Sequence, residues 1–352
     1  MSVRKILRVG LLVVFAGSMF AGELPPSMRA ARELLESGSI DAAEREFKKV
    51  NGADAEGAEA SFWLGEIALL RNDPEKAIAA FERSVALAPS NSRYHHRLGD
   101  AFGRAAQNAS IFSALGLARK CMGAFQRAVA LDPANLDARY SLFLFYCNAP
   151  RIIGGGADKA LAEALAIRAA DPDRGRVALA ALYVSQKKVE AARGELAGIV
   201  AVDLADTRSD HVSLSDVKWL SADVAMGEPV RNHHWFDVKD QGEIVLLVHG
   251  RLYAKGLAAR TPSRYAYQLA GAWRTFTATV GLQDGSKEEE SAVFVLRGDG
   301  RDLFRSRPLR VDESQRVKVD VGGVSHLELV AEVNGAHTRQ TKAVWADPTL
   351  RR

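Results

Sequence analysis

The chain has few cysteines and lacks the common catalytic and nucleotide-binding motifs. Cys121 and Cys147 are the only thiols among 352 residues, so a framework of several disulfides is excluded. No Cys-x-x-Cys, His-Glu-x-x-His or Gly-x-Ser-x-Gly pattern is present, and the glycines at 154–156 lack the spacing of a phosphate-binding loop. These absences argue against a zinc enzyme, a serine hydrolase and a nucleotide-binding protein. We therefore expect no catalytic residues, no catalytic metal and no cofactor.

The chain also lacks a strong net charge. Its 47 basic and 43 acidic residues give +4, and Arg4, Lys5 and Arg8 supply three of these charges. The rest of the chain is therefore close to neutral, which argues against a nucleic-acid partner.

No apolar run is long enough to cross a bilayer, but the first residues have the pattern of a secretory signal. Basic residues precede the apolar segment 9–15, and small residues at 16–18 and at Ala21 follow it. An apolar segment of this length is too short for a transmembrane helix. We assign residues 1–22 as a signal peptide and expect an exported protein, periplasmic or secreted, with no transmembrane anchor.

Residues 25–203 repeat a pattern whose basic period is near 34 residues. Each clear copy has a leucine, a small residue, an aromatic or second small residue, and a proline, and the copies occupy 64–89, 98–133 and 142–172. The second copy is about ten residues longer at 105–114, and the third is about five residues longer near 149–159. Both extra segments fall between paired helices, so we interpret them as lengthened loops.

This pattern resembles the tetratricopeptide repeat, and the resemblance predicts a helical solenoid (TPR α-solenoid) over residues 23–205. The family's role is protein binding, often through a concave surface formed by the first helix of each pair, so it implies a protein partner. The motif specifies packing and not which residues contact a partner. Cys121 and Cys147 both fall on predicted helices; the sequence leaves open whether they are separate buried thiols or form a disulfide.

After about residue 208, alternation with a period of two replaces helical spacing. The turn residues Gly298-Asp299-Gly300 lie between two such segments and favour a hairpin, because glycine accepts positive φ without strain. So many short strands indicate a two-sheet sandwich or jelly roll. The predicted strands are 243–248, 264–269, 274–282, 291–296, 316–321 and 327–333.

The segments 252–284, 292–306, 317–330 and 343–350 resemble, in this order, the NPCBM family of carbohydrate-binding modules attached to family 98 glycoside hydrolases. The resemblance implies a galactose-binding-like β-jelly roll over residues 209–352 and recognition of a glycan. The chain departs from the family at Arg260, where a histidine is usual, and at Lys342, in a segment that is usually more acidic. Because some relatives bind a structural calcium through oxygen ligands, this loss of carboxylates weakens the expectation of calcium here.

A sugar site requires an aromatic face and several polar groups in a loop-lined depression. The segment 230–237 has this composition. Two other loops each contribute one further candidate, Arg260 and Asn334. The alternative is that Trp235 fills the end of the sandwich and its neighbouring histidines are merely solvated. The tentative glycan-binding residues are Arg231, His233, His234, Trp235, Arg260 and Asn334.

Together these features predict an exported, non-catalytic adaptor with a protein-binding helical half and a glycan-binding strand-rich half. The competing hypothesis is a protein-interaction scaffold whose jelly roll has lost sugar binding, and it is motivated by the changes at Arg260 and Lys342. Catalysis by this chain has little support, since the acidic run at 286–291 is typical of a solvated loop.

Overall fold

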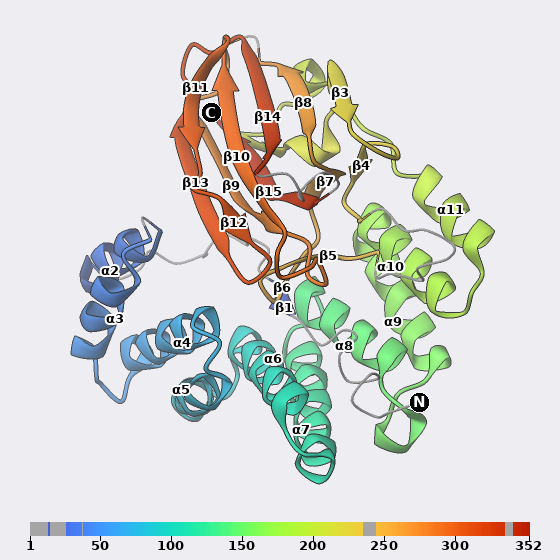
Figure 1. Ribbon diagram of the computed structural model, residues 1–352. Helices are drawn as coiled ribbons and strands as arrows, with labels where there is room; N and C mark the ends of the chain where they lie inside the picture. Colours follow the sequence, from blue (N-terminus) through green and yellow to red (C-terminus); the bar gives the residue numbers. More distant parts are fainter. Residues whose placement is uncertain (1–12, 15–25, 37, 235–243, 270, 335–340) are drawn as a thin grey trace. The chain divides into compact units, whose positions relative to one another are not determined.

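The computed structural model describes residues 13–14, 26–36, 38–234, 244–269, 271–334 and 341–352 (Figure 1). Contacts divide the chain between Gln186 and Lys187 into two compact units. The first is helical and the second consists mainly of strands, so the expected order of α followed by β is confirmed. Most of the expected signal peptide lies outside the described residues. Its only described part is β1 (Val13–Val14).

Helices of 9 to 21 residues follow one another along the first half of the chain. None of the helices in the described ranges has the length and apolar character needed to cross a membrane. They are α2 (Pro26–Glu36), α3 (Ile40–Lys49), α4 (Ala55–Leu70), α5 (Pro74–Leu87), α6 (Ser92–Asn108), α7 (Ile111–Leu131), α8 (Leu136–Asn148), α9 (Ala157–Ala170), α10 (Pro172–Ser185) and α11 (Val189–Ala197).

The even-numbered helices from α4 to α10 are the first helices of their pairs, and each starts at a capping side chain. The oxygens of Asp54, Asn91, Asn135 and Asp171 accept hydrogen bonds from backbone N–H groups in the first turn. Such caps satisfy donors that have no partner within the helix. These capping residues therefore mark the start of α4, α6, α8 and α10.

The two helices of a pair approach closely at a glycine. A Cβ atom on Gly65 of α4 would lie 2.6 Å from the ring of Phe81 on α5, and a Cβ on Gly99 of α6 would lie 2.5 Å from the ring of Phe125 on α7. Glycine is therefore required at these positions because the ring occupies the space of a side chain. These contacts confirm the tetratricopeptide-like packing of the first two clear copies.

The first extra segment is not a loop. Residues 105–114 were expected to lengthen the turn of the second copy, but they extend α6 and α7, and only Ala109 and Ser110 separate these helices. The second extra segment is a turn as expected, and it contains a short 3-10 helix (Arg151–Ile153) and Gly154 with φ of 101°.

The second unit is an antiparallel sandwich of two sheets. One sheet has the order β11-β10-β14-β8-β3 with β12 beside β10, and the other has β13-β9-β15-β7-β4 with β2 beside β15. The strands are β2 (His211–Ser213), β3 (Ser221–Val224), β4 (Val230–Arg231), β5 (Leu246–Val248), β6 (Arg251–Tyr253), β7 (Gly256–Arg260), β8 (Ser263–Gln268), β9 (Thr275–Leu282), β10 (Ser291–Gly298), β11 (Arg301–Arg305), β12 (Leu309–Arg310), β13 (Ser314–Asp320), β14 (His326–Val333) and β15 (Lys342–Arg351).

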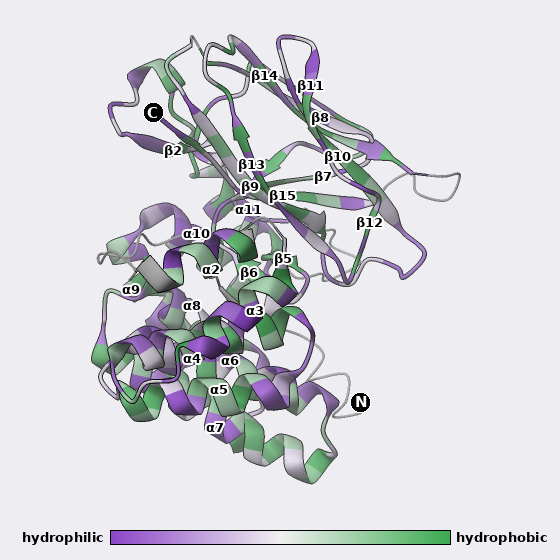
Figure 2. Cartoon of the chain, turned by 90° about the vertical axis from the view of Figure 1, so that its left-hand side faces the viewer, coloured by the Kyte–Doolittle hydropathy of each residue, from purple (hydrophilic) through white to green (hydrophobic). Residues whose placement is uncertain are grey.

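The core lies between the two sheets and is rich in aromatic side chains. Trp345 packs its ring edge to face against Phe276 and Phe294, and Tyr265 and Tyr267 are almost fully buried. Colouring by hydropathy shows that hydrophobic and hydrophilic residues both occur along the strands of this unit (Figure 2). Tyr265, Tyr267 and Trp345 are therefore packing residues of this core.

The predicted hairpin at 298–300 joins β10 to β11. Asp299 and Gly300 have φ values of 48° and 79°, as a tight hairpin turn requires. A second hairpin, β5 with β6, contributes Leu246, Val248 and Tyr253 to a small separate core that also contains residues of β7 and β15. Both faces of the β7–β15 part of the sheet are therefore covered.

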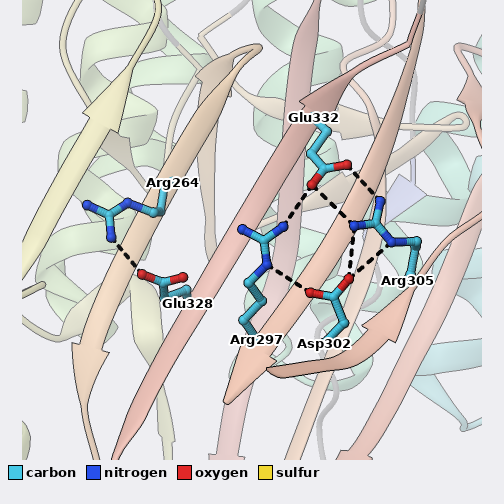
Figure 3. Close-up of polar contacts among 6 residues, drawn as sticks. All are labelled: Arg264, Arg297, Asp302, Arg305, Glu328 and Glu332. Carbon is cyan, nitrogen blue, oxygen red and sulfur yellow. Dashed lines mark hydrogen bonds and ion pairs between the residues drawn. The ribbon is translucent and has the colours of Figure 1, made fainter. Parts of the chain in front are cut away.

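The outer face of the β10–β14 sheet carries a network of ion pairs (Figure 3). Arg297 and Arg305 each bond to both Asp302 and Glu332, with N to O distances of 2.7 to 2.9 Å in the closest pairs. Beside this network, Val295 and Val330 face each other across β10 and β14 and are only 0% and 7% exposed. Long charged side chains can cover apolar surface in this way while their charges stay in water.

Candidate functional site

The first helices of the repeats are joined to one another by polar side chains. Glu59 of α4 accepts hydrogen bonds from Trp63 Nε1 at 2.9 Å and Tyr94 Oη at 2.7 Å, and it pairs with Arg93 of α6. From α8 to α10, Asp137 pairs with Arg174 at 2.7 Å. This surface is the one that tetratricopeptide repeats present to partners, so its polar side chains are candidates for partner recognition.

A buried ionic cluster lies at the centre of this row. Arg97 donates two hydrogen bonds to Glu66 and one, at 2.9 Å, to Asp100 Oδ2, and all three side chains are at most 6% exposed. Two carboxylates thus share one guanidinium. Burial raises the pKa of Asp100 to about 7, against the opposing effect of Arg97, and Oδ1 of Asp100 has no hydrogen-bond partner within the described part of the chain.

His96 brings a serine and an aspartate together, but not in the geometry of a catalytic triad. Its Nε2 lies 2.9 Å from Ser141 Oγ and 3.5 Å from Asp100 Oδ2, so both neighbours meet the same ring nitrogen. A triad requires the aspartate at Nδ1 and the serine at Nε2. Burial and the nearby guanidinium groups also lower the pKa of His96 well below 6.5. We interpret the contact as a link between α6 and α8.

In the second unit, Arg231 is used inside the structure. Its guanidinium lies 3.8 Å from the centre of the Trp219 ring and donates hydrogen bonds to the carbonyl oxygens of Ser215 and Val217. Burial lowers the pKa of Arg231. Trp219 also makes an edge-on contact with Tyr265, at 5.5 Å between ring centres. Arg231 therefore occupies one face of Trp219 and holds β4 in place.

The residues after Arg231 also turn inward. Asn232, with φ of 62°, donates a hydrogen bond to Asp216 and accepts one from the backbone N–H of Gly256. His233 Nδ1 lies 3.0 Å from the carbonyl oxygen of His234, and burial lowers the pKa of His233. His234 is 7% exposed. Trp235, the aromatic centre of the predicted site, lies outside the described residues.

Arg260 and Asn334 lie at one end of the sandwich, three residues along β7 from the level of Arg231. Arg260 is the last residue of β7, and Asn334 follows β14 and donates a hydrogen bond to Ser291 Oγ at 2.9 Å. The chain crosses from one sheet to the other at this end at Thr261 and Pro262, between β7 and β8. Arg260 and Lys342 are direct cross-strand neighbours, so two basic side chains share one edge of this end.

The structure thus divides the tentative glycan-binding residues into two groups. Arg231 pairs with Leu257 and Arg260 with Lys342, so three residues of β7, about 10 Å, separate the groups. Sequence reasoning did not identify Trp219, Asp216 or Lys255, which support the first group. Asp216 accepts hydrogen bonds at 2.8 Å from both Lys255 and Asn232. Trp219 follows the short turn Leu214–Asp216 by three residues, and no motif in the sequence marks it as a contact of Arg231.

Two of the described tryptophans of the second unit have no exposed face for a sugar. Trp273 and Trp345 are each 2% exposed, and Arg352 lies 5.0 Å from the centre of the Trp273 ring. Both tryptophans are therefore packing residues.

The cysteines are free thiols in the helical unit. Cys121 is buried on α7 at the repeat position that Ala77 occupies on α5, and Cys147 is half-buried on α8. Burial raises the pKa of Cys121 well above its usual value and that of Cys147 to about 12. Of the two alternatives that the sequence leaves open, the structure has separate thiols. Within the described ranges, no three or more His, Cys, Asp or Glu side chains gather in a way that could hold a metal ion.

Comparison with known proteins finds a matching family model in each half of the chain. Residues 210–351 match the model of the NPCBM/NEW2 domain, and residues 28–92 match a tetratricopeptide-repeat model. A curated protein of Renibacterium salmoninarum, named as a candidate endo-alpha-N-acetylgalactosaminidase, is 28% identical over 135 residues. That match covers 38% of this chain and 9% of the relative, so the chain spans less than a tenth of the relative's length.

Two solved structures are similar to one half each. The CBM51 module of Clostridium perfringens GH95, in complex with methyl-galactose, is 26% identical over 40% of this chain and 99% of its own, with a TM-score of 0.35. A tetratricopeptide-repeat protein of Thermus thermophilus is 22% identical over 49% of this chain and 87% of its own, with a TM-score of 0.41. The two matched families are binding domains and not catalytic ones.

Proposed function

We propose that this chain, in which an NPCBM/NEW2 domain follows tetratricopeptide repeats, is an exported, non-catalytic adaptor. Residues 1–22 act as its signal peptide, residues 23–205 bind a protein, and residues 209–352 bind a glycan. The observation that carries the proposal is that the carbohydrate-binding family match spans the sandwich from β2 to β15.

The glycan is held at the end of the sandwich where β7 and β14 finish. Arg260, Asn334 and Lys342 present a guanidinium, an amide and an ammonium group there, and hydroxyl groups of sugars are good partners for such side chains. Arg231, His233 and His234 act indirectly and do not contact the glycan. Their internal contacts position the segment that leads into Trp235.

The protein partner binds along the first helices. Glu59 and Arg93, and Asp137 of α8, are partly exposed in this row, so a peptide on this surface meets charges of both signs. The Glu66, Arg97 and Asp100 cluster is buried and supports the helices that carry them. Polar groups held by their neighbours favour selective recognition because little side-chain freedom is lost on binding.

A second function, a scaffold whose sandwich no longer binds sugar, is favoured by one observation. Arg231 and Asn232 are committed to internal contacts, and the described tryptophans are packed or covered. In that case the sandwich contributes stability and a protein-facing surface.

The test is glycan binding by the chain from residue 23 onward, on an array that includes neutral and acidic oligosaccharides. The variants are Arg260→Ala, Asn334→Ala and Trp235→Ala. Arg301→Ala is the matched control, because Arg301 is an exposed arginine beside Gly298, at the other end of β10 from Ser291. We expect each site variant to weaken glycan binding by about tenfold, the loss of one charged or stacking contact, and the control to bind normally.

The thermal midpoint separates the two functions. A glycan binder keeps its midpoint in Arg260→Ala while affinity falls. Absence of binding to every glycan by the unaltered chain, together with a lowered midpoint in Trp235→Ala, would establish the scaffold instead.

A further inference from the structure

The hairpin formed by α6 and α7 is longer than the helix pair before it. Gly99 is followed by nine residues of α6, whereas the equivalent Gly65 is followed by five residues of α4. Phe125 is preceded by 14 residues of α7, whereas the equivalent Phe81 is preceded by seven residues of α5. The two helices therefore continue past the corresponding helix ends by four and seven residues, about 6 and 10 Å.

The end of this hairpin is apolar and uncharged. Phe112 is 88% exposed and Ile111 is 50% exposed, although an exposed helix end does not require apolar side chains. Residues 107–118 contain no charged side chain. The first turns of α7 are correspondingly drawn in green and white in Figure 2. We call Ile111 and Phe112 the hairpin tip.

Behind the tip, the exposed side of α7 is basic. Arg119, Lys120 and Arg127 are all exposed, and residues 101–131 contain no Asp or Glu. Arg119 and Arg127 follow Phe112 by 7 and 15 residues, near whole numbers of helical turns, so they lie on the same side of α7 as Phe112. The apolar hairpin tip is thus followed along α7 by exposed basic side chains and by no acidic ones.

We propose that the hairpin tip binds the surface of a membrane rich in anionic phospholipids. Phe112 and Ile111 enter the boundary between headgroups and acyl chains, and Arg119 and Lys120 lie at the level of the phosphates. The seven residues from Phe112 to Arg119 rise about 10 Å, comparable to the 5 to 10 Å depth of interfacial insertion. Each basic residue near an anionic leaflet adds attraction.

A lipid surface suits this feature better than a protein does. The tip is convex, and a convex pair of apolar side chains needs a pocket on a protein partner but no preformed site on a bilayer. The complete absence of acidic residues over α7 also matches a uniformly negative surface more closely than the mixed charges of a protein.

Sedimentation with lipid vesicles tests the proposal, using the chain from residue 23 onward so that the apolar segment 9–15 does not itself bind lipid. The vesicles contain equal amounts of phosphatidylglycerol and phosphatidylcholine, with pure phosphatidylcholine as the reference. We expect binding to the anionic vesicles only, and a loss of about tenfold in Phe112→Ser, the cost of one phenylalanine left in water. The double variant Arg119→Gln, Lys120→Gln is expected to lose more than tenfold.

Ile152→Ser is the matched control, because Ile152 is 82% exposed but lies in the next repeat and not at the tip. It should bind vesicles like the unaltered chain. Failure of the unaltered chain to sediment with anionic vesicles, or an equal loss in Ile152→Ser, would overturn the proposal. So would loss of a protein partner in Phe112→Ser without any lipid binding. None of these outcomes depends on whether the sandwich binds glycan.

Discussion

Single residues decide how closely paired helices pack in the repeats. Gly65 and Gly99 each face a phenylalanine ring from the partner helix. The third copy uses the reverse combination, since Phe143 occupies the glycine position on α8 and Ala164 occupies the phenylalanine position on α9. Both are fully buried. Each pair therefore has one bulky and one small residue at these two equivalent positions, but which helix supplies the bulky one changes.

The glycine contact leads to a first prediction. In Gly99→Ala the new Cβ would be 2.5 Å from the Phe125 ring, so we expect the free energy of unfolding of the helical unit to fall by about 1 to 3 kcal/mol. Urea unfolding followed by circular dichroism measures it. Gly116→Ala is the control within α7: its Cβ would meet nothing within 4 Å, and alanine should stabilise the helix by about 1 kcal/mol. Equal effects of the two substitutions would contradict the packing argument.

At the same scale, residue types were predictable from the sequence but their surroundings were not. The small residues and aromatics of the repeats follow from their spacing, and the hairpin follows from its turn residues. Positive φ was expected of the glycines there and occurs at Gly300 and at Asp299. The role of Arg231 does not, because its partners Ser215, Val217 and Trp219 are far along the chain from its own loop. A loop composition that suits a sugar site also suits a set of internal hydrogen bonds.

Among the elements, α4, α6 and α8 are tied together by the cluster around Arg97. Glu66 comes from α4, His96 and Asp100 from α6, and Ser141 from α8. A buried polar network of this kind is costly if any member loses its partner, so it favours one relative placement of the three helices.

The second prediction concerns the pH dependence of this cluster. The pKa of Asp100 is raised from 3.8 to about 7, so between these pH values the folded state holds a proton that the unfolded state has released. Stability therefore falls as pH rises through this window. In Asp100→Asn the contribution disappears, and we expect the free energy of unfolding of the variant minus that of the unaltered chain to rise from about pH 4 to about pH 7 and to be level outside it.

Urea unfolding at a series of pH values gives this difference. His96 acts in the opposite direction, since its lowered pKa costs stability as pH falls below about 6.5, and it is present in both proteins. A difference that is flat across the window would mean that Asp100 is ionised in the folded state throughout.

The extra segments show what a repeat period can and cannot predict about elements. The period locates both segments, but not their conformation. Residues 105–114 have no proline or glycine and continue two helices, whereas the later segment contains Pro150 and three glycines and turns. The local composition of each segment therefore distinguishes helix from turn, whereas the number of extra residues does not. The sandwich end is different, because only the strand order brings Arg260 and Asn334 to the same end.

For the whole molecule, the separate cores predict two unfolding transitions. Trp63 is the only tryptophan before the division at 186, and the other four, at 219, 235, 273 and 345, follow it. Tryptophan fluorescence should therefore report mainly the sandwich, while circular dichroism at helical wavelengths reports the repeats. We expect the two signals to give non-coincident urea curves, as for proteins with independently folding domains. Superimposable curves would show instead that the units unfold together.

The exchange of bulky and small residues between α8 and α9 limits how this array can be rebuilt. A copy of α4 in place of α8 would set a glycine beside Ala164 and leave a void, and a copy of α5 in place of α9 would force a phenylalanine against Phe143. Transplanting α4 and α5 together introduces neither fault. In recombination between repeats, whether by evolution or by a protein engineer, the part that can be moved is the helix pair and not the helix.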